Sequence, residues 1–337
     1  MRSEPAPLAV SLGDPAGIGP ELIAAAWERR AELALAPFAA IGGAKLLAAA
    51  AEQRGITLPV RLVSSLSEAA AVFADALPVF GDADADFTPG TPSTTGARVA
   101  LASLEGAAAL ALAGEVSALV TMPIAKAELA KIGFTHPGQT EFVAAACGLP
   151  PGAGVMMLAG PSLRAVPLTV HCALAEVAGR LSVEMIVRKA TIVVEALRRD
   201  FGIANPRLAV CGLNPHAGEQ GRMGREDIEI ITPAIAALRA AGIDATGPHP
   251  ADALFAPRAR ATYDVALAMY HDQALIPVKA LDFDLGVNVT LGLPIVRTSP
   301  DHGTAFDIAG TGVADEGATI AAIRMAADCA ARRAAHG

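Results

Sequence analysis

Aromatic residues are scarce in this sequence of 337 residues, where Phe, Trp and Tyr together make up 4% of the chain. This scarcity disfavours an aromatic-lined binding module and a β-sandwich. Ala, Leu, Val and Ile supply most of the 53% hydrophobic content, which favours helices packed on a buried parallel sheet. A charged fraction of 18% beside this apolar content excludes an intrinsically disordered chain.

Basic blocks and long apolar runs are also missing. The 26 Lys and Arg residues are outnumbered by 34 Asp and Glu residues, which argues against a nucleic-acid or anionic-membrane partner. No apolar stretch reaches the ~20 residues of a membrane span, and Pro and Asp interrupt the first residues too early for a signal peptide. The four cysteines lack C-x-x-C spacing, which indicates reduced thiols with a structural role. We therefore expect a cytoplasmic protein.

Short β-branched runs alternate with longer Ala- and Leu-rich stretches, a pattern that predicts βαβ units and a mostly parallel sheet. At ~100–200 residues per domain, the length is that of two domains or one large α/β unit. The expected strands are 8–12, 38–41, 60–63, 118–122, 155–158, 163–170, 208–211, 265–269 and 287–291. The clearest expected helices are 20–29, 98–112, 181–199 and 225–241.

Three of the seven histidines follow strand-like runs: His171 after LRAVPLTV, His216 after RLAVCGLNP and His271 after DVALAMY. Ligands of α/β sheets gather outside the carboxyl ends of the strands. Three imidazoles delivered there would make an open divalent-metal site with positions left for substrate oxygens. Each histidine taken alone could instead be a hydrogen-bonded loop or core residue, and spacing does not show that the three converge.

Further polar residues follow the third histidine. Lys279 lies eight positions beyond His271, and Asn288 and Arg297 flank the run VNVTLGLPIV. The guanidinium of Arg297 is the natural clamp for a phosphate or carboxylate, because it makes two parallel hydrogen bonds to either group. Lys279 could simply be a solvated surface lysine.

Two other segments have the character of ligand-binding loops. Gln139 and Thr140 open an apolar helix, where Thr140 could simply be an N-cap. The glycine-punctuated stretch 301–322 carries Asp307, whose carboxylate could accept hydrogen bonds from both ribose hydroxyls of a nucleotide. The same charge would repel a 2′-phosphate, which favours NAD over NADP. GDPAGIGPE, at 13–21, lacks the G-x-G-x-x-G pattern and is most simply a tight turn before a helix.

Five long segments carry a family resemblance: GDPAGIGPE, TMPIAKAELAKIGFTHPGQTEF, CGLNPHAGEQGRMGREDIEII, MYHDQALIPVKAL and GVNVTLGLPIVRTSPDHGTAFDIAGTG. Together they resemble the 4-hydroxythreonine-4-phosphate dehydrogenase family of pyridoxal 5′-phosphate biosynthesis. HGTAFDIAGTG also resembles the adenosine-binding loop of the isocitrate and isopropylmalate dehydrogenases, whose fold this family shares. The resemblance implies two α/β/α domains with mostly parallel sheets. Residues 1–120 and 285–337 would form the nucleotide-side domain, and 121–284 the metal, substrate and dimerisation domain.

The resemblance also implies roles for individual residues. His171, His216 and His271 match the family's ligands for zinc, magnesium or cobalt, in a site shared across a homodimer so that one ligand comes from the partner chain. The residues that match substrate contacts are Gln139, Thr140, Lys279, Asn288 and Arg297. Those that match the cofactor loop for NAD, with NADP as an alternative, are His302, Gly303 and Asp307.

Two positions depart from the family pattern. Gln139 stands where the family usually has His, and an amide cannot carry positive charge toward a phosphate. Ala253 stands where Thr is expected, which is a milder change.

The reaction implied is NAD-dependent oxidation of 4-phosphooxy-L-threonine at C3, with loss of CO2, to give 3-amino-2-oxopropyl phosphate. A divalent metal would stabilise the alkoxide and then the enolate. Lys279 is the candidate to support the developing oxyanion or to carry a proton, and a simple substrate contact is equally compatible. The alternatives are a dehydrogenase of D-threonate or D-erythronate 4-phosphate, a three-histidine metal hydrolase, and a non-catalytic metal or nucleotide sensor.

Overall fold

The computed structural model describes residues 6–336, and these divide into two units. The first consists of residues up to 154 together with 293–335, and the second of residues 155–292. Sequence analysis set the domain boundaries at 120 and 285 instead. Residues 121–154 lie in the first unit, where helices α5 (Lys126–Lys131) and α6 (Gln139–Ala146) pack against helix α4 (Thr94–Ala113).

The first unit contains a parallel sheet in the strand order β3-β4-β2-β1-β5-β12. Its strands are β1 (Leu8–Ser11), β2 (Phe38–Ile41), β3 (Val60–Val63), β4 (Leu77–Phe80), β5 (Ala118–Thr121) and β12 (Arg297–Pro300). Every residue of β1, β2, β5 and β12 is buried, as expected for parallel strands covered on both faces.

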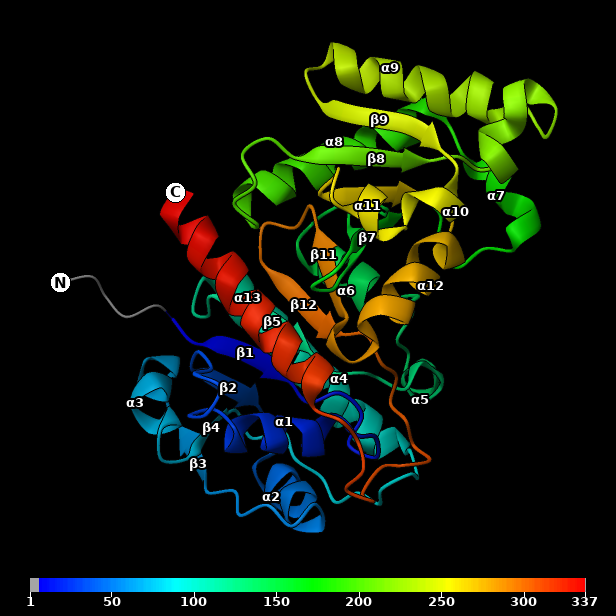
Figure 1. Ribbon diagram of the computed structural model, residues 1–337. Helices are drawn as coiled ribbons and strands as arrows, with labels where there is room; N and C mark the ends of the chain where they lie inside the picture. The colour runs from blue at the N-terminus through cyan, green and yellow to red at the C-terminus, as the bar shows by residue number, and fades with distance from the viewer. Residues whose placement is uncertain (1–5, 337) are drawn as a thin grey trace. The chain divides into compact units, whose positions relative to one another are not determined.

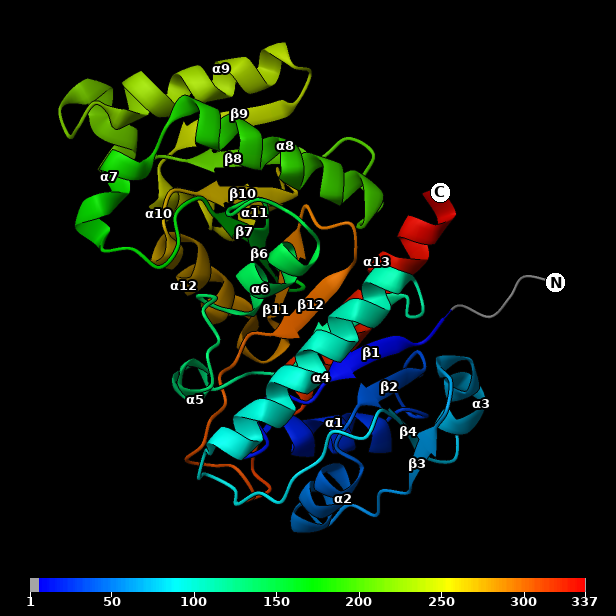
Figure 2. The same cartoon turned by 180° about the vertical axis from the view of Figure 1, so that it is seen from behind.

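Helices cover both faces of this sheet: α13 lies in front of it in Figure 1, and α4 lies in front of it in the reverse view of Figure 2. The remaining helices of the unit are α1 (Gly19–Glu28), α2 (Ala44–Gln53), η1 (Leu66–Glu68), α3 (Ala69–Phe73) and α13 (Gly317–His336). Helix α4 is capped at its start by Ser93, whose hydroxyl accepts a hydrogen bond from the Gly96 amide, and at its end by Gly114 in the left-handed conformation.

Helix α4 is long and apolar enough to cross a membrane by length and composition alone. Half of its most apolar window is buried, however, and it packs against β1, β2 and β5. Leu104, Ala107, Ala108 and Ala111 belong to the hydrophobic core beside this sheet. We therefore interpret α4 as a core helix.

The second unit contains a mixed sheet in the order β11-β6-β7-β10-β8-β9. Its strands are β6 (Val155–Ala159), β7 (Arg164–Pro167), β8 (Arg207–Cys211), β9 (Asp244–His249), β10 (Val265–Ala268) and β11 (Val287–Leu291). The four strands β7, β10, β8 and β9 run parallel, and β6 runs antiparallel to both β7 and β11.

Helices lie on both faces of the second sheet as well, with α12 on the face seen in Figure 1 and α8 on the face seen in Figure 2. The α-helices are α7 (Val177–Arg180), α8 (Val183–Arg199), α9 (Thr232–Ala240), α10 (Ala251–Leu254), α11 (Pro257–Arg260) and α12 (His271–Asp282). The short 3-10 and π segments are η2 (Leu174–Glu176), η3 (Pro215–Gly221), η4 (Asp227–Ile231) and η5 (Phe283–Leu285). The expected fold class, α/β with mostly parallel sheets, is confirmed.

Candidate active site

The three histidines predicted as metal ligands follow three neighbouring strands of the second unit. His171 lies beyond β7, His271 beyond β10 and His216 beyond β8, and β10 pairs in parallel with both of its neighbours. Parallel strands end at the same edge of a sheet, so all three histidines belong to one edge. This is the position at which α/β sheets bind ligands.

Backbone hydrogen bonds bring His171 and His271 together. The Leu168 amide donates to the Ala268 carbonyl at 2.8 Å, and both the amide and the hydroxyl of Thr169 donate to the Met269 carbonyl, at 3.2 and 2.8 Å. The two imidazole centroids are consequently 6.1 Å apart. Nδ1 of His271 contacts Oδ1 of Asp272 at 2.7 Å, which leaves its Nε2 directed away from that carboxylate.

His216 lies in a left-handed turn. Residues 216–220 all have positive φ, between 41° and 77°, although only Gly218 among them is a glycine. The buried carboxylate of Asp227 supports this turn by accepting hydrogen bonds from the amides of Leu213 and Asn214, at 2.9 and 3.3 Å. His216 itself is exposed, and within residues 6–336 it does not join the other two histidines in a three-ligand group.

A cavity of about 400 Å³ opens beside the histidine pair. It is lined by Thr169, Val170, His171, Cys172, Ala173, Leu174, Val177, Tyr270, His271 and Asp272. Two imidazoles and a carboxylate therefore face a space large enough for a small organic molecule.

His171 and His271 could supply two of the ligands of a divalent metal ion. Two imidazoles bound to one zinc ion at about 2.0–2.1 Å place their ring centroids on the order of 5–6 Å apart, which agrees with the observed pair. Imidazole nitrogen suits zinc, whereas magnesium prefers oxygen ligands. Within residues 6–336 no group of three or more His, Cys, Asp or Glu side chains could hold a metal ion, so a complete site would need a further ligand beside this pair.

Lys279 and Asn288 also belong to the second unit. Lys279 lies two turns along α12 from His271, with its ammonium group 5.9 Å from the ring centroid of Phe283. Asn288 lies on β11, and its buried Oδ1 has no hydrogen-bond partner among the described residues. A buried amide oxygen of this kind is available to a ligand.

Arg297 opens β12 of the first unit and is 3% exposed. Its guanidinium donates to the hydroxyls of Thr121, from Nε at 3.1 Å and from Nη2 at 2.6 Å, and of Thr140, from Nη1 at 3.3 Å. Burial lowers the pKa of Arg297 to about 10, while the nearby Glu141 carboxylate acts in the opposite direction. The side chain thus remains a cation at neutral pH.

Helix α6 presents its first residues to this arginine. The N-cap is Gly138, so the alternative interpretation of Thr140 as an N-cap is wrong, and its hydroxyl contacts Arg297 instead. Gln139 donates from Nε2 to the Met122 carbonyl at 3.0 Å. Its buried Oε1 has no hydrogen-bond partner among the described residues. An anion bound at this site would contact the buried guanidinium of Arg297 and the hydroxyl of Thr140, beside the uncharged amide of Gln139.

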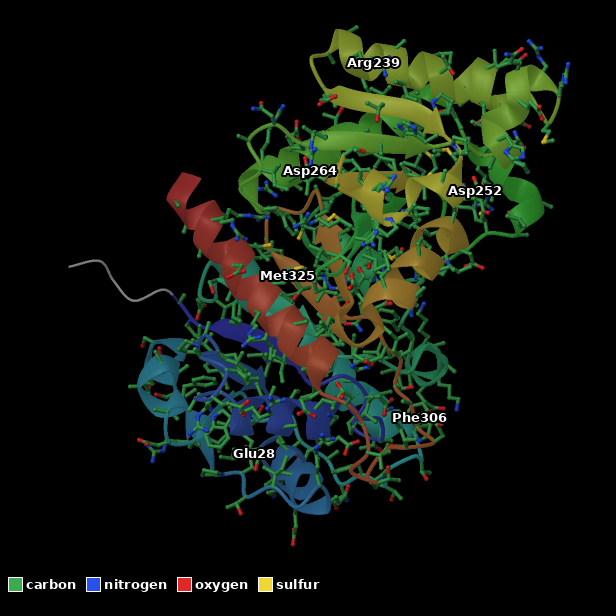
Figure 3. The ribbon with its side chains drawn as sticks, viewed as in Figure 1. Glu28, Arg239, Asp252, Asp264, Phe306 and Met325 are labelled. Atoms are coloured by element: carbon green, nitrogen blue, oxygen red, sulfur yellow. The ribbon has the colours of Figure 1, made fainter. Side chains whose placement is uncertain are left out.

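The predicted cofactor residues lie in the loop between β12 and α13, where Figure 3 labels Phe306. Asp307 and Gly303 are exposed and His302 is half-buried. The loop packs on the turn after β1: the Thr304 carbonyl accepts from the Ile18 amide at 3.0 Å, and a Cβ on Gly17 would lie 2.7 Å from that oxygen. Gly17 is therefore needed for close approach of the two segments.

Sequence reasoning missed a charged cluster at the far end of this loop. Arg54 donates to the Ala314 carbonyl and to Glu316, both at 2.7 Å, and Arg29 pairs with Glu316 at 3.1 Å. Arg54 also lies 3.9 Å from the buried carboxylate of Glu21, whose pKa is raised by burial. Glu21, Arg29 and Glu316 lie in segments that the sequence analysis described, but Arg54, which joins them, does not.

Comparisons with known proteins agree with this architecture. The family model for pyridoxal phosphate biosynthetic protein PdxA matches residues 34–326. The 4-hydroxythreonine-4-phosphate dehydrogenase of Erythrobacter litoralis (strain HTCC2594) is 65% identical over 328 residues, which cover 97% of this chain and 98% of that protein.

Two solved structures cover nearly the whole chain. The 4-hydroxythreonine-4-phosphate dehydrogenase of Klebsiella pneumoniae is 35% identical with a TM-score of 0.84, covering 98% of this chain and 99% of that one. A terephthalate 1,2-cis-dihydrodiol dehydrogenase of Burkholderia xenovorans LB400 is 33% identical with a TM-score of 0.65, covering 96% and 98%.

Proposed function

The chain belongs to the PdxA family of pyridoxal phosphate biosynthetic proteins, and from this membership we propose that it oxidises and decarboxylates 4-phosphooxy-L-threonine to 3-amino-2-oxopropyl phosphate with NAD. The observation that carries the proposal is the placement of three histidines beyond three adjacent parallel strands, with two of their rings 6.1 Å apart. NADP is the alternative cofactor.

The metal ligands are His171, His216 and His271, with zinc, magnesium or cobalt as the ion. Since His171 and His271 already lie together in one chain, His216 of a second copy is the ligand that completes the site. A bound divalent cation would supply Lewis-acid polarisation of the substrate hydroxyl and of the carbonyl that replaces it.

Residues of the chain itself bind and orient the substrate. Arg297, with Thr140, holds an anionic group. The buried Oε1 of Gln139 would accept a hydrogen bond from a donor of the substrate beside it. Asn288 offers its buried carbonyl oxygen to a donor on the substrate. Lys279 holds or transfers a proton at the reacting oxygen.

Asp307 accepts hydrogen bonds from the ribose hydroxyls of NAD, with His302 and Gly303 contacting the same nucleotide. An exposed carboxylate in a loop fixed at both ends is suited to this role.

Exposed apolar residues support the proposed homodimer. Ile276 is 64% exposed, Phe283 69% and Leu285 46%, all on α12 or immediately after it. A second copy that covers this surface would bury the apolar side chains next to the helix that begins with His271. We place the enzyme in the cytoplasm.

One observation favours a second candidate substrate. Gln139 carries no charge where the family usually has His. The second candidate is a dehydrogenase of D-threonate or D-erythronate 4-phosphate on the same site, and this departure from the family pattern is its support.

A spectrophotometric assay distinguishes these functions. The purified protein should form NADH from 4-phosphooxy-L-threonine, lose this activity on chelation and regain it with added divalent metal. Faster turnover of D-threonate or D-erythronate 4-phosphate would favour the second candidate. Activity unaffected by complete metal removal, or retained by His216→Ala, would refute the metal-dependent mechanism.

A further inference from the structure

Met269, which directly follows β10, is held by hydrogen bonds at both its amide and its carbonyl. The Met269 carbonyl accepts from the amide and hydroxyl of Thr169, as described above, and the Met269 amide donates to Oε1 of Gln273 at 2.6 Å. Met269 is two residues before His271, and Thr169 is two residues before His171. Both donor and acceptor of this buried residue are therefore fixed close to the two ligands.

The other end of the Gln273 amide reaches a third strand. Its Nε2 donates to the Gly212 carbonyl at 2.9 Å, directly after β8 and at the start of the segment that leads to His216. Gln273 thus links the ends of β10 and β8, while Thr169 links the ends of β7 and β10. All the ligand-bearing strand ends are joined by these two side chains.

The amide of Gln273 supplies both the acceptor and the donor that these contacts require. One partner is a backbone N–H that requires an acceptor, and the other is a backbone carbonyl that requires a donor. An ionised Glu would keep the first contact and lose the second, and a Met of similar length would lose both.

We propose that Gln273 is a positioning residue for the metal centre, which its amide preforms by joining the strand ends that carry His271 and His216. This inference rests on the proposed metal-dependent function. Both ends of the Gln273 amide bond backbone groups, so the role assigned to it is indirect. It restricts the loop conformations that the ligands would otherwise sample before binding, as outer-shell partners of metal ligands do.

The test is a titration of the metal-free protein with Co²⁺, followed by the visible absorption of the bound ion. Gln273→Met and Thr169→Val should each bind Co²⁺ about 10–100-fold more weakly than the wild type. Gln53→Met, a matched change at an exposed glutamine of the first unit, should bind with unchanged affinity. Thermal unfolding of each metal-free variant is measured in parallel.

The outcomes distinguish the positioning role of Gln273 from the existence of the metal centre. Wild-type binding that is lost in His171→Ala establishes the centre, and wild-type affinity in a folded Gln273→Met would then overturn the positioning role alone. A lowered unfolding temperature with unchanged Co²⁺ affinity would also overturn it, because a purely structural residue behaves in that way. Absence of Co²⁺ binding in the wild type would overturn both the positioning role of Gln273 and the proposed metal dependence.

Discussion

Arg297 donates two of its hydrogen bonds to a single oxygen, the hydroxyl of Thr121 on the adjacent strand. Arg297 pairs in register with Leu119, and Thr121 lies two residues further along β5. Both Arg297 and Thr121 are fully or almost fully buried. The hydroxyl therefore sets the orientation of the guanidinium, so that its remaining edge points to Thr140.

Thr121→Val should disturb this orientation without altering side-chain shape. Leaving buried donors without their acceptor costs about 1–3 kcal/mol, so the variant should unfold at lower denaturant concentration. The KM for the phosphorylated substrate should rise more than kcat falls. Thr57→Val, at an exposed threonine, is the control. A wild-type KM in Thr121→Val would contradict the role given to this pair.

Asp14 supplies a pH-dependent prediction. Its carboxylate is 1% exposed, Oδ1 accepts from the Ala16 amide at 2.9 Å, and burial raises its pKa above 3.8. As the pH rises from 3.8 through the raised value, the unfolded chain ionises before the folded one, so this group makes the protein less stable.

Asp14→Asn keeps the size of the side chain and removes the ionisation. The unfolding temperature of the variant relative to wild type should therefore increase from acidic to neutral pH. Differential scanning calorimetry at both pH values measures this. A difference that does not vary with pH would show that Asp14 ionisation makes no contribution to stability.

Asp307→Lys tests the cofactor loop. Reversing the charge removes the acceptor for the ribose hydroxyls and the repulsion of a 2′-phosphate. The ratio of kcat/KM for NAD to that for NADP should fall by about tenfold, which corresponds to a change of 1.4 kcal/mol. Asp315→Lys, an exposed acid near the end of the same loop, should leave the ratio nearly unchanged. An unchanged ratio in Asp307→Lys would eliminate this role for Asp307.

Arg54 should determine how well the same loop is ordered. Its guanidinium joins the Ala314 carbonyl, Glu316 and the region of the buried Glu21, so Arg54→Ala releases the loop and leaves that carboxylate without a nearby cation. We expect the KM for NAD to rise several-fold while the affinity for Co²⁺ stays constant. Arg61→Ala, at an exposed arginine of the same unit, is the control. Equal NAD kinetics in the two variants would argue against the loop-ordering role.

The fold class could be predicted from the sequence because buried parallel strands have short, nearly continuous apolar sequences. All nine expected strands are present, whereas β4, β9 and β12 were missed. The strand β9 has the sequence DATGPH, whose Gly and Pro are typical of turns, and its pairing with β8 stabilises it despite this composition. The expected helix at 225–241 is a π segment followed by α9.

The candidate site could be proposed from the sequence in its residues but not in its geometry. Each histidine proposed as a metal ligand was selected because it follows a strand, but the strand order β7-β10-β8 that makes them neighbours is a tertiary property. Gln273 and Arg54 act through backbone groups distant in sequence, so no local pattern marks them. For Thr140 the local sequence suggested a helix cap, but the structure places its hydroxyl against Arg297, which is distant in sequence.

The left-handed turn at 216–220 limits which sequences this segment can tolerate. L-residues other than glycine adopt this conformation at a cost of roughly 1–2 kcal/mol each, and β-branched side chains fit it worst. A randomised library of these five positions, selected only for folded protein, should accordingly be depleted in Val, Ile and Thr and enriched in Gly and Asn. Persistence of a non-glycine residue at position 216 under selection for catalysis would then measure how strongly chemistry outweighs backbone preference.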